Sequence, residues 1–220
     1  FMAALEKIVL GPERPILLTQ EDKERIAYHE SGHAILGLLV PGADPVNRVS
    51  IVPRGQALGV TYQRPDKDKY NYEEEYLRAR IIGILGGRSA EEVVFGTKTT
   101  GAENDIQQAT EIARAMVTRW GMSKELGLVQ LSGPRNEYLG VSAGQQAYSE
   151  DTAKRIDAEV VRIIQECHEE AKKLLKENRK ALDTLAQALL EKENLNEDEI
   201  LKATGLPPAP KLVSRKIDLE

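Results

Sequence analysis

Five consecutive residues, His29 to His33, carry the side chains best suited to chemistry. They read His-Glu-Ser-Gly-His, with two histidines four positions apart and a glutamate directly after the first. If this stretch is helical, both imidazoles project from one face, because four residues make just over one turn. Two neutral imidazole nitrogens can then occupy two corners of a tetrahedral zinc site, with Glu30 beside the open coordination position. The pattern predicts a metal-dependent hydrolase in which His29 and His33 are zinc ligands and Glu30 is the catalytic base.

The same residues could instead be an ordinary solvated turn of a helix with no metal-binding role. Against this reading, the chain has only three histidines, and two of them belong to the pattern. The flanking sequence predicts a helix from about residue 20 to residue 39. Thr19 is suited to the N-cap with Asp22 three positions later, and Pro41 ends the helix. Apolar residues at helical spacing predict that most of this helix is buried: Ile26, Ala34, Ile35, Leu38 and Leu39.

A catalytic zinc ion usually takes three protein ligands and leaves a fourth position for water. A third histidine six residues after the second is excluded, because Leu39 occupies that position. His168 lies far along the chain in a helical segment, and we interpret it as a solvated helix residue. Carboxylates remain. Asp105 ranks modestly ahead because the start of a predicted helix favours an ionised carboxylate, but Glu91 or Glu92 could also reach the metal or support a zinc histidine.

The elements that must position these groups are mainly helical. Two β-rich runs, 46–52 and 58–63, flank a segment with proline and glycine and predict a hairpin. An exposed edge of this hairpin could hold an extended peptide by main-chain hydrogen bonds, or the hairpin could only cover the helix. A helix is expected over about 73–94, where the pair Gly86-Gly87 indicates close helix packing or a break.

Further helices are predicted downstream. Thr100 and Glu103 form a capping-box pattern for a helix that runs to about residue 119. The glycine-rich stretch 122–148 is expected to be a functional flap or a flexible segment. Amphipathic helices over about 149–178 and 179–191 predict an αα-hairpin, and Cys167 continues the buried stripe of the first of them, which indicates packing rather than catalysis. Asn196 caps one more short helix, which Gly205 ends.

The expected fold class is mainly α: a helical zinc-metallopeptidase domain with a small β-hairpin or sheet and a C-terminal αα-hairpin. Hydrophobic residues make up 41% and charged residues 30% of the 220, as in a soluble globular protein. The net charge of −5 gives no basic field for nucleic acid. A single cysteine excludes an intramolecular disulfide and a cysteine-based zinc cluster. No apolar run approaches the length of a membrane span.

Four motifs in order resemble the protease domain of the FtsH family, which comprises membrane-anchored, ATP-dependent AAA+ zinc metalloproteases. They are Tyr28 to Ala34, Val52 to Gly55, Gly86 to Glu92 and Thr99 to Asp105. The resemblance extends over nearly the whole chain, although Ser31 stands where the family usually has alanine. It implies that Asp105 is the third ligand, beside His29 and His33, of one zinc ion per chain.

The resemblance also implies a domain organisation. Residues 1–18 would be a linker or the tail of a preceding ATPase module, 19–148 the zinc-binding peptidase core, 149–206 a C-terminal helical subdomain and 207–220 a flexible tail. The chain has no G-x-x-x-x-G-K-[ST] phosphate loop, so ATP is expected to act only through an ATPase module outside this chain. Apart from the zinc ligands, no cofactor-binding residues are expected.

Partners and location are likewise expectations from the resemblance. Substrates would be unfolded, damaged or membrane proteins, and the protease domains would form a ring in a homo-hexamer. No nucleic acid is expected as a partner. The location would be the cytoplasmic side of the inner membrane of a bacterium or of an equivalent organelle membrane, reached only through a segment outside this chain, so that the fragment itself would be soluble.

Two other functions need to be distinguished from this one. The chain could be a helical ring-assembly module, with the charged helices over 150–191 building the ring around a structural or inactive metal site. It could also be a stand-alone zinc peptidase that acts without ATP. Cleavage of casein that a chelator blocks would argue against the assembly module, and digestion of folded proteins without assistance would favour the stand-alone peptidase.

Overall fold

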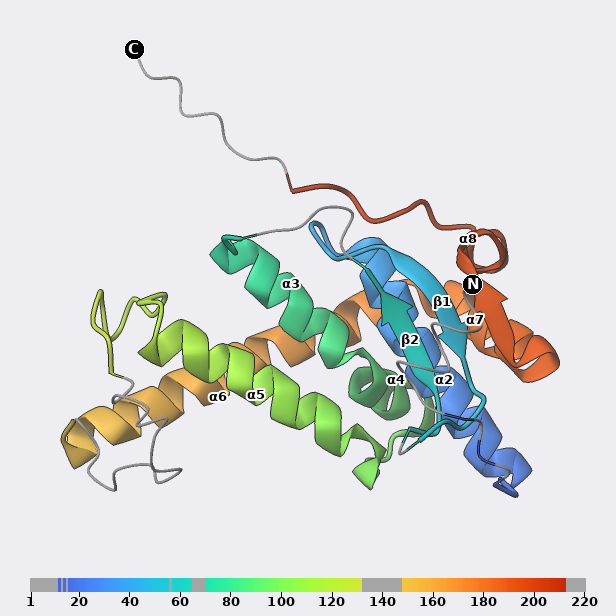
Figure 1. Ribbon diagram of the computed structural model, residues 1–220, viewed down its shortest axis with the longest axis horizontal. Helices are drawn as coiled ribbons and strands as arrows, with labels where there is room; N and C mark the ends of the chain where they lie inside the picture. Colours follow the sequence, from blue (N-terminus) through green and yellow to red (C-terminus); the bar gives the residue numbers. More distant parts are fainter. Residues whose placement is uncertain are drawn as a thin grey trace, which may run out of the picture.

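The computed structural model describes residues 12, 14, 16–55, 57–64, 70–131 and 148–212. These residues form a mainly α-helical domain with a small antiparallel sheet, which confirms the predicted fold class (Figure 1). Most of the predicted linker over residues 1–18, most of the glycine-rich stretch before residue 148 and the end of the C-terminal tail lie outside the described residues. Where the chain is described, no helix combines the length and the apolar character that a membrane span needs.

In chain order, the elements are helix α2 (Gln20–Leu39), strands β1 (Val46–Ser50) and β2 (Val60–Gln63), helices α3 (Glu74–Ile84) and α4 (Gly86–Phe95), the 3₁₀ turn η1 (Thr100–Ala102), helices α5 (Glu103–Thr118), α6 (Glu150–Glu177) and α7 (Arg179–Lys192), strand β3 (Asn194–Asn196) and helix α8 (Glu197–Thr204). Helix α2 contacts α3, α4, α6, α7 and both β1 and β2, so it runs through the middle of the fold.

Helix α2 begins as the sequence predicts. The Thr19 hydroxyl accepts a hydrogen bond from the backbone amide of Asp22, and the Asp22 carboxylate accepts one from the amide of Thr19, which completes a capping box. The middle of the helix is fully buried at Ala27, Ala34, Ile35 and Leu36. The second half of the helix, from Ala34 to Leu39, is apolar on most of its faces and is stable only when buried, which explains why it lies in the interior.

The helix expected over 73–94 is divided at Leu85 into α3 and α4. Glycine explains how α4 then packs: a Cβ atom on Gly86 would lie 2.8 Å from the backbone of Gly32, and a Cβ atom on Gly32 would lie 2.3 Å from the carbonyl oxygen of Gly86. Helices α2 and α4 therefore approach backbone to backbone, which a side chain on either residue would prevent. Both predicted outcomes for this glycine pair, a break and close packing, occur together.

The sheet has the strand order β2-β1-β3, and all its pairings are antiparallel. Strands β1 and β2 are the predicted hairpin. Strand β3 was not predicted, because three residues are too few to show an alternating pattern; its buried Leu195 pairs with Val49 of β1. Within the described residues, β2 is therefore an edge strand.

The start of α5 differs from the prediction. Its N-cap position is Ala102, and the capping hydroxyl belongs to Thr99, which accepts a hydrogen bond from the amide of Gly101. The prediction of a Thr100–Glu103 capping box was wrong because a 3₁₀ turn precedes the α-helix, which places Thr100 inside the first turn and moves the cap one residue earlier.

Both helices of the predicted C-terminal hairpin are present and meet at Asn178. Helix α6 packs mainly against α4 and α5, whereas α7 packs mainly against α2 and α8. Cys167 is fully buried in the core, as its place in the apolar stripe predicted. The two helices thus connect the part of the domain around α4 and α5 with the part around α2 and α8. Helix α6 also packs His168 against α4.

Candidate metal centre

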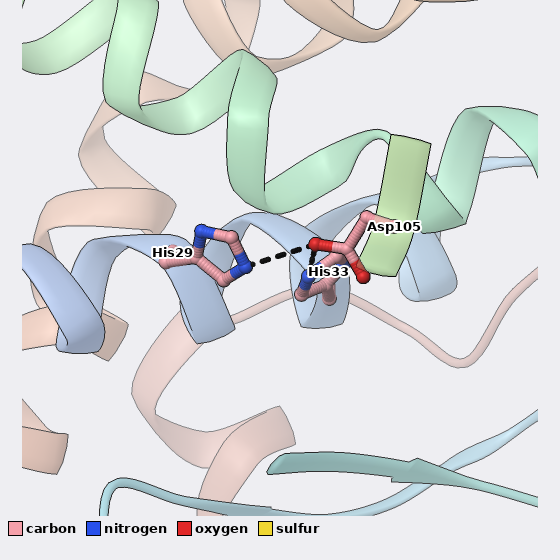
Figure 2. Close-up of side chains that lie close together, drawn as sticks. All are labelled: His29, His33 and Asp105. Atoms are coloured by element: carbon pink, nitrogen blue, oxygen red, sulfur yellow. Dashed lines mark hydrogen bonds and ion pairs between the residues drawn. The ribbon is translucent and has the colours of Figure 1, made fainter. Parts of the chain in front are cut away.

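The two histidines of α2 and Asp105 of α5 converge on one point (Figure 2). Asp105 Oδ2 lies 3.1 Å from His29 Nε2 and 3.5 Å from His33 Nε2. One ligand atom from each of the three residues lies within 4.8 Å of the other two. Helix α2 places the imidazoles one turn apart, and the first turn of α5 brings the carboxylate to them from more than 70 residues away in the chain.

Hydrogen bonds at the far side of each ring determine which nitrogen faces Asp105. His33 Nδ1 lies 2.8 Å from the carbonyl oxygen of Gly83, which can only accept, so Nδ1 is the donor. His29 Nδ1 lies 2.8 Å from Glu91 Oε1, and an ionised carboxylate also only accepts. In neutral rings the two Nε2 lone pairs therefore face the oxygen of Asp105.

Three acceptor atoms that face one another repel unless a proton or a metal cation lies between them. Two imidazole nitrogens and one carboxylate oxygen are a usual donor set for a catalytic zinc ion with an open fourth position. Oxygen acceptors behind zinc histidines are also common, because they orient the ring and fix its tautomer. The residues present thus fit a zinc ion.

The electrostatics of the site favour positive charge at the same point. Burial opposes the charge on His29, but hydrogen bonds to Asp105 and Glu91 raise the pKa of this imidazole to about 10. Burial also opposes ionisation of Asp105, yet hydrogen bonds with His29 and His33 outweigh it and hold the pKa of the Asp105 carboxyl well below its usual range. Carboxylates that favour a proton on His29 would also attract a divalent cation in its place.

Glu30 lies beside His29, His33 and Asp105, and Thr61 of strand β2 hydrogen-bonds to it. It is only 7% exposed, and the Thr61 hydroxyl lies 2.8 Å from Glu30 Oε2 and 3.0 Å from the Glu30 carbonyl oxygen. Burial raises the pKa of the Glu30 carboxyl, while the nearby positive charge of His33 and His29 acts in the opposite direction. A carboxylate with a raised pKa is suited to take up and return a proton.

Strand β2 and the residue before it contribute groups that the sequence did not identify. Besides Thr61, Gly59 approaches Glu30 so closely that a Cβ atom there would lie 2.7 Å from Glu30 Oε1. Gly87 of α4 approaches His29 in the same way, since a Cβ atom there would lie 2.2 Å from His29 Nε2. The glycines 59 and 87 are visible in the sequence, but no local pattern shows which side chains they would meet.

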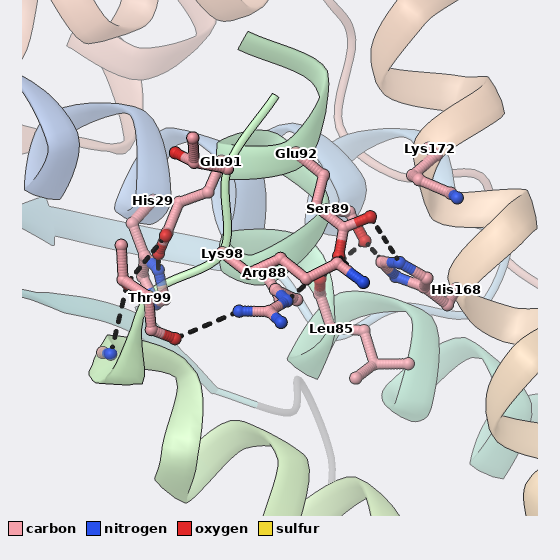
Figure 3. A network of polar contacts seen from close by, with 12 residues as sticks. His29, Leu85, Arg88, Ser89, Glu91, Glu92, Lys98, Thr99, His168 and Lys172 are labelled. Carbon is pink, nitrogen blue, oxygen red and sulfur yellow. Dashed lines mark hydrogen bonds and ion pairs between the residues drawn. The ribbon is translucent and has the colours of Figure 1, made fainter. Parts of the chain in front are cut away.

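The two other carboxylates considered as ligands lie elsewhere. Glu91 is 2% exposed and binds His29 Nδ1, on the side of the ring away from Asp105. It therefore orients His29 and does not lie among the converging atoms of His29, His33 and Asp105. Glu92 Oε2 lies 3.3 Å from His168 Nε2, and His168 Nδ1 lies 2.9 Å from the hydroxyl of the buried Ser89 (Figure 3). The interpretation of His168 as solvated was therefore wrong, because α6 packs it against α4.

The group opens into a cleft of about 1400 Å³. Residues of α2, α3 and the start of α5 line the cleft, together with residues 57–63 that include the edge strand β2. An open cleft with a strand edge along it can accommodate an extended chain as well as a small molecule. The arrangement is therefore chemically suited to metal-assisted hydrolysis of an extended substrate.

The chain is similar to known proteins over nearly its whole length. The profile of peptidase family M41 matches residues 16–203. The ATP-dependent zinc metalloprotease FtsH of Syntrophus aciditrophicus is 66% identical over 220 residues, which cover 99% of this chain and 30% of that protein. Proteins of the same name from Thermobaculum terrenum and Myxococcus xanthus are 61% and 46% identical, over 94% and 91% of this chain and 32% of each relative. The chain thus spans about a third of the length of these relatives.

Proposed function

The chain belongs to peptidase family M41, and we propose that it is the zinc-dependent endopeptidase domain of a longer, FtsH-like, ATP-dependent protease. The observation that carries this function is the convergence of His29, His33 and Asp105 on one point, with the buried Glu30 beside them. The relatives are named zinc metalloproteases, and the donor set suits that metal.

In the proposed site, His29, His33 and Asp105 would hold one zinc ion. Zinc, when bound, supplies a Lewis acid that acidifies water and polarises a peptide carbonyl. Glu30 takes a proton from the attacking water and returns it to the leaving amine. Because Thr61 binds Glu30 Oε2, we assign the proton exchange to Oε1. Glu91 and the Gly83 carbonyl keep both Nε2 atoms directed at the metal position.

Substrate is proposed to bind as an extended peptide along strand β2. This strand lies at the edge of the sheet in the described part of the chain, and residues 60–63 line the cleft. Main-chain hydrogen bonds to a strand edge hold a peptide without regard to its sequence, and the cleft side chains then select among side chains. Such binding requires an unfolded substrate, because the backbone of a folded one is already paired.

The remaining proposals concern the longer protein. An ATPase module outside this chain would deliver unfolded, damaged or membrane proteins, and six copies would form a ring. We place the protein at the cytoplasmic side of the inner membrane of a bacterium or of an equivalent organelle membrane. Residues 1–18 would connect to the ATPase module, 19–148 form the peptidase core, 149–206 the helical subdomain and 207–220 a tail. The relatives are named ATP-dependent and extend well beyond the length of this chain, which supports an ATPase module outside it; the ring, the location and the domain bounds rest on the family resemblance alone.

The test is hydrolysis of casein by the purified chain. We expect cleavage in the presence of zinc, loss of cleavage with a chelator and recovery when zinc is added back. Glu30→Gln is expected to abolish cleavage while the protein still binds one zinc ion. Zinc binding without cleavage in the unmodified chain would instead favour a ring-assembly module with a structural metal, and unassisted digestion of folded proteins would favour a stand-alone peptidase.

A further inference from the structure

The short segment between α4 and η1 connects the two halves of the metal centre. It begins after α4 ends at Phe95, and its last residue is Thr99. The Thr99 hydroxyl donates a hydrogen bond to Glu91 Oε2 over 2.7 Å, while the other oxygen of Glu91 binds His29 Nδ1 over 2.8 Å. The Glu91 carboxylate is therefore held at both oxygens, and Thr99 supplies the contact on the side away from the histidine.

The same hydroxyl also acts on the element that carries Asp105. It accepts a hydrogen bond from the amide of Gly101 over 3.3 Å and so caps the 3₁₀ turn η1, which continues directly into α5. Asp105 is the third residue of α5. One side chain is thus hydrogen-bonded on one side to the carboxylate that orients a histidine of α2, and on the other to the turn that starts the helix of the third ligand.

Arg88 holds the backbone of Thr99 in place. Its guanidinium donates from Nη1 to the Thr99 carbonyl oxygen over 3.0 Å and from Nε to Glu92 Oε1 over 3.0 Å (Figure 3). Glu92 in turn contacts His168 of α6. Arg25 of α2 binds the segment at a second place, through the Thr97 hydroxyl over 3.0 Å. The segment is thereby bound directly to α2 and α4, and indirectly, through Glu92 and His168, to α6.

We propose that Thr99 is a positioning residue, whose hydroxyl fixes Glu91 against His29 and at the same time fixes the start of α5, so that the imidazoles and Asp105 stay at metal-binding distance. This inference rests on the proposed zinc site. Its physical basis is that a metal ligand binds more tightly when hydrogen bonds from neighbouring residues already fix its orientation. Arg88 contributes indirectly, because it anchors the Thr99 backbone.

The test measures the zinc dissociation constant of the purified chain by competition with a chromophoric chelator. Thr99→Val keeps the shape of the side chain but removes both hydrogen bonds, and we expect it to weaken zinc binding by about 10- to 100-fold. Thr99→Ser keeps the hydroxyl and is expected to restore most of the affinity. Thr110→Val is the matched control: its hydroxyl lies on the same helix as Asp105 but only donates to the carbonyl oxygen of Ile106, so its loss should leave the affinity unchanged.

A second readout reports geometry instead of affinity. With cobalt(II) in place of zinc, the visible absorption bands depend on how the ligands are arranged. We expect Thr99→Val to shift these bands and Thr110→Val to leave them unchanged. In a double-mutant cycle, Thr99→Val should lower the zinc affinity less in a Glu91→Gln background than alone, because part of its effect passes through Glu91.

Two results would overturn the proposal: a Thr99→Val variant that binds zinc as tightly as the unmodified chain, or a Thr99→Ser variant as weak as Thr99→Val. Far-UV circular dichroism establishes that each variant is folded. Should Thr99→Val not fold, Arg88→Met replaces it, and unchanged zinc affinity in that variant would also count against the proposal. An unmodified chain that does not bind zinc would contradict the metal centre itself, so the two failures can be told apart.

Discussion

The contact between Gly87 and His29 allows a sharp test of the metal centre. An alanine at position 87 would place its Cβ atom 2.2 Å from His29 Nε2, where ordinary contact needs more than 3.4 Å, so the ring must move by more than 1 Å. That movement breaks the hydrogen bond between His29 and Glu91, and a hydrogen bond to a charged group contributes about 1.5–3 kcal/mol. We therefore expect Gly87→Ala to weaken zinc binding by about 10- to 100-fold.

The matched control is Gly96→Ala at the other end of α4. Gly96 has φ of +66°, and its Cβ atom would meet nothing within 4 Å. Alanine in this left-handed conformation costs about 1–2 kcal/mol, which lowers the Tm of a domain of this size by roughly 2–4 °C per kcal/mol. The control thus destabilises the same helix without touching the histidines.

The assay combines zinc titration against a chelator with thermal unfolding with and without zinc. A ligand that binds only the folded state raises the Tm, so the zinc-induced rise should be retained in Gly96→Ala and lost or reduced in Gly87→Ala. Unchanged zinc affinity in Gly87→Ala would refute the reasoning. So would an equal loss in both variants, because the loss would then follow from general destabilisation.

Three further outcomes are expected. The Ser31 side chain is fully buried, and its hydroxyl has no hydrogen-bond partner among the described residues; Ser31→Ala should therefore raise the free energy of unfolding by up to about 1 kcal/mol, and a clear loss in urea denaturation would contradict this. Asp105→Asn should lower the zinc content measured by metal analysis, whereas unchanged content would show that Asp105 is not a zinc ligand. Burial raises the pKa of the Cys167 thiol to about 11, so at pH 8 the native thiol stays protonated and should react slowly with iodoacetamide, and fast reaction without denaturant would show that the thiol is accessible.

Local patterns in the sequence predicted the part of the site that one helix builds. His29, Glu30 and His33 lie together because a helix brings residues three and four apart onto one face, whatever the rest of the chain does. The capping box at Thr19 and the hairpin β1–β2 were predictable for the same reason, since each depends on neighbouring residues. The break at Leu85 was predicted only as one of two alternatives, and the 3₁₀ turn before α5 was missed, because both depend on how the helices pack.

The identity of the carboxylate that joins the two histidines could not be derived from local sequence patterns. By chemistry alone the sequence left Asp105, Glu91 and Glu92 open, and only the resemblance to a known family selected Asp105. In the structure, packing of α5 beside α3 and α6 brings Asp105 within 3.1 Å of His29, while the close approach of α2 and α4 places Glu91 behind the ring. Which side chains of different helices come into contact depends on tertiary packing, and this cannot be read from their spacing along the chain.

The sequence by itself therefore determined the helix with its two imidazoles and one carboxylate, because those positions follow from the helical repeat. Only the tertiary structure decided what surrounds them: Asp105 in front, Glu91 and Thr99 behind, and Thr61 across the cleft. These contacts join residues that are 8 to 76 positions apart, and the glycine-mediated contact of α2 with α4 and the hairpin beside α2 bring them together.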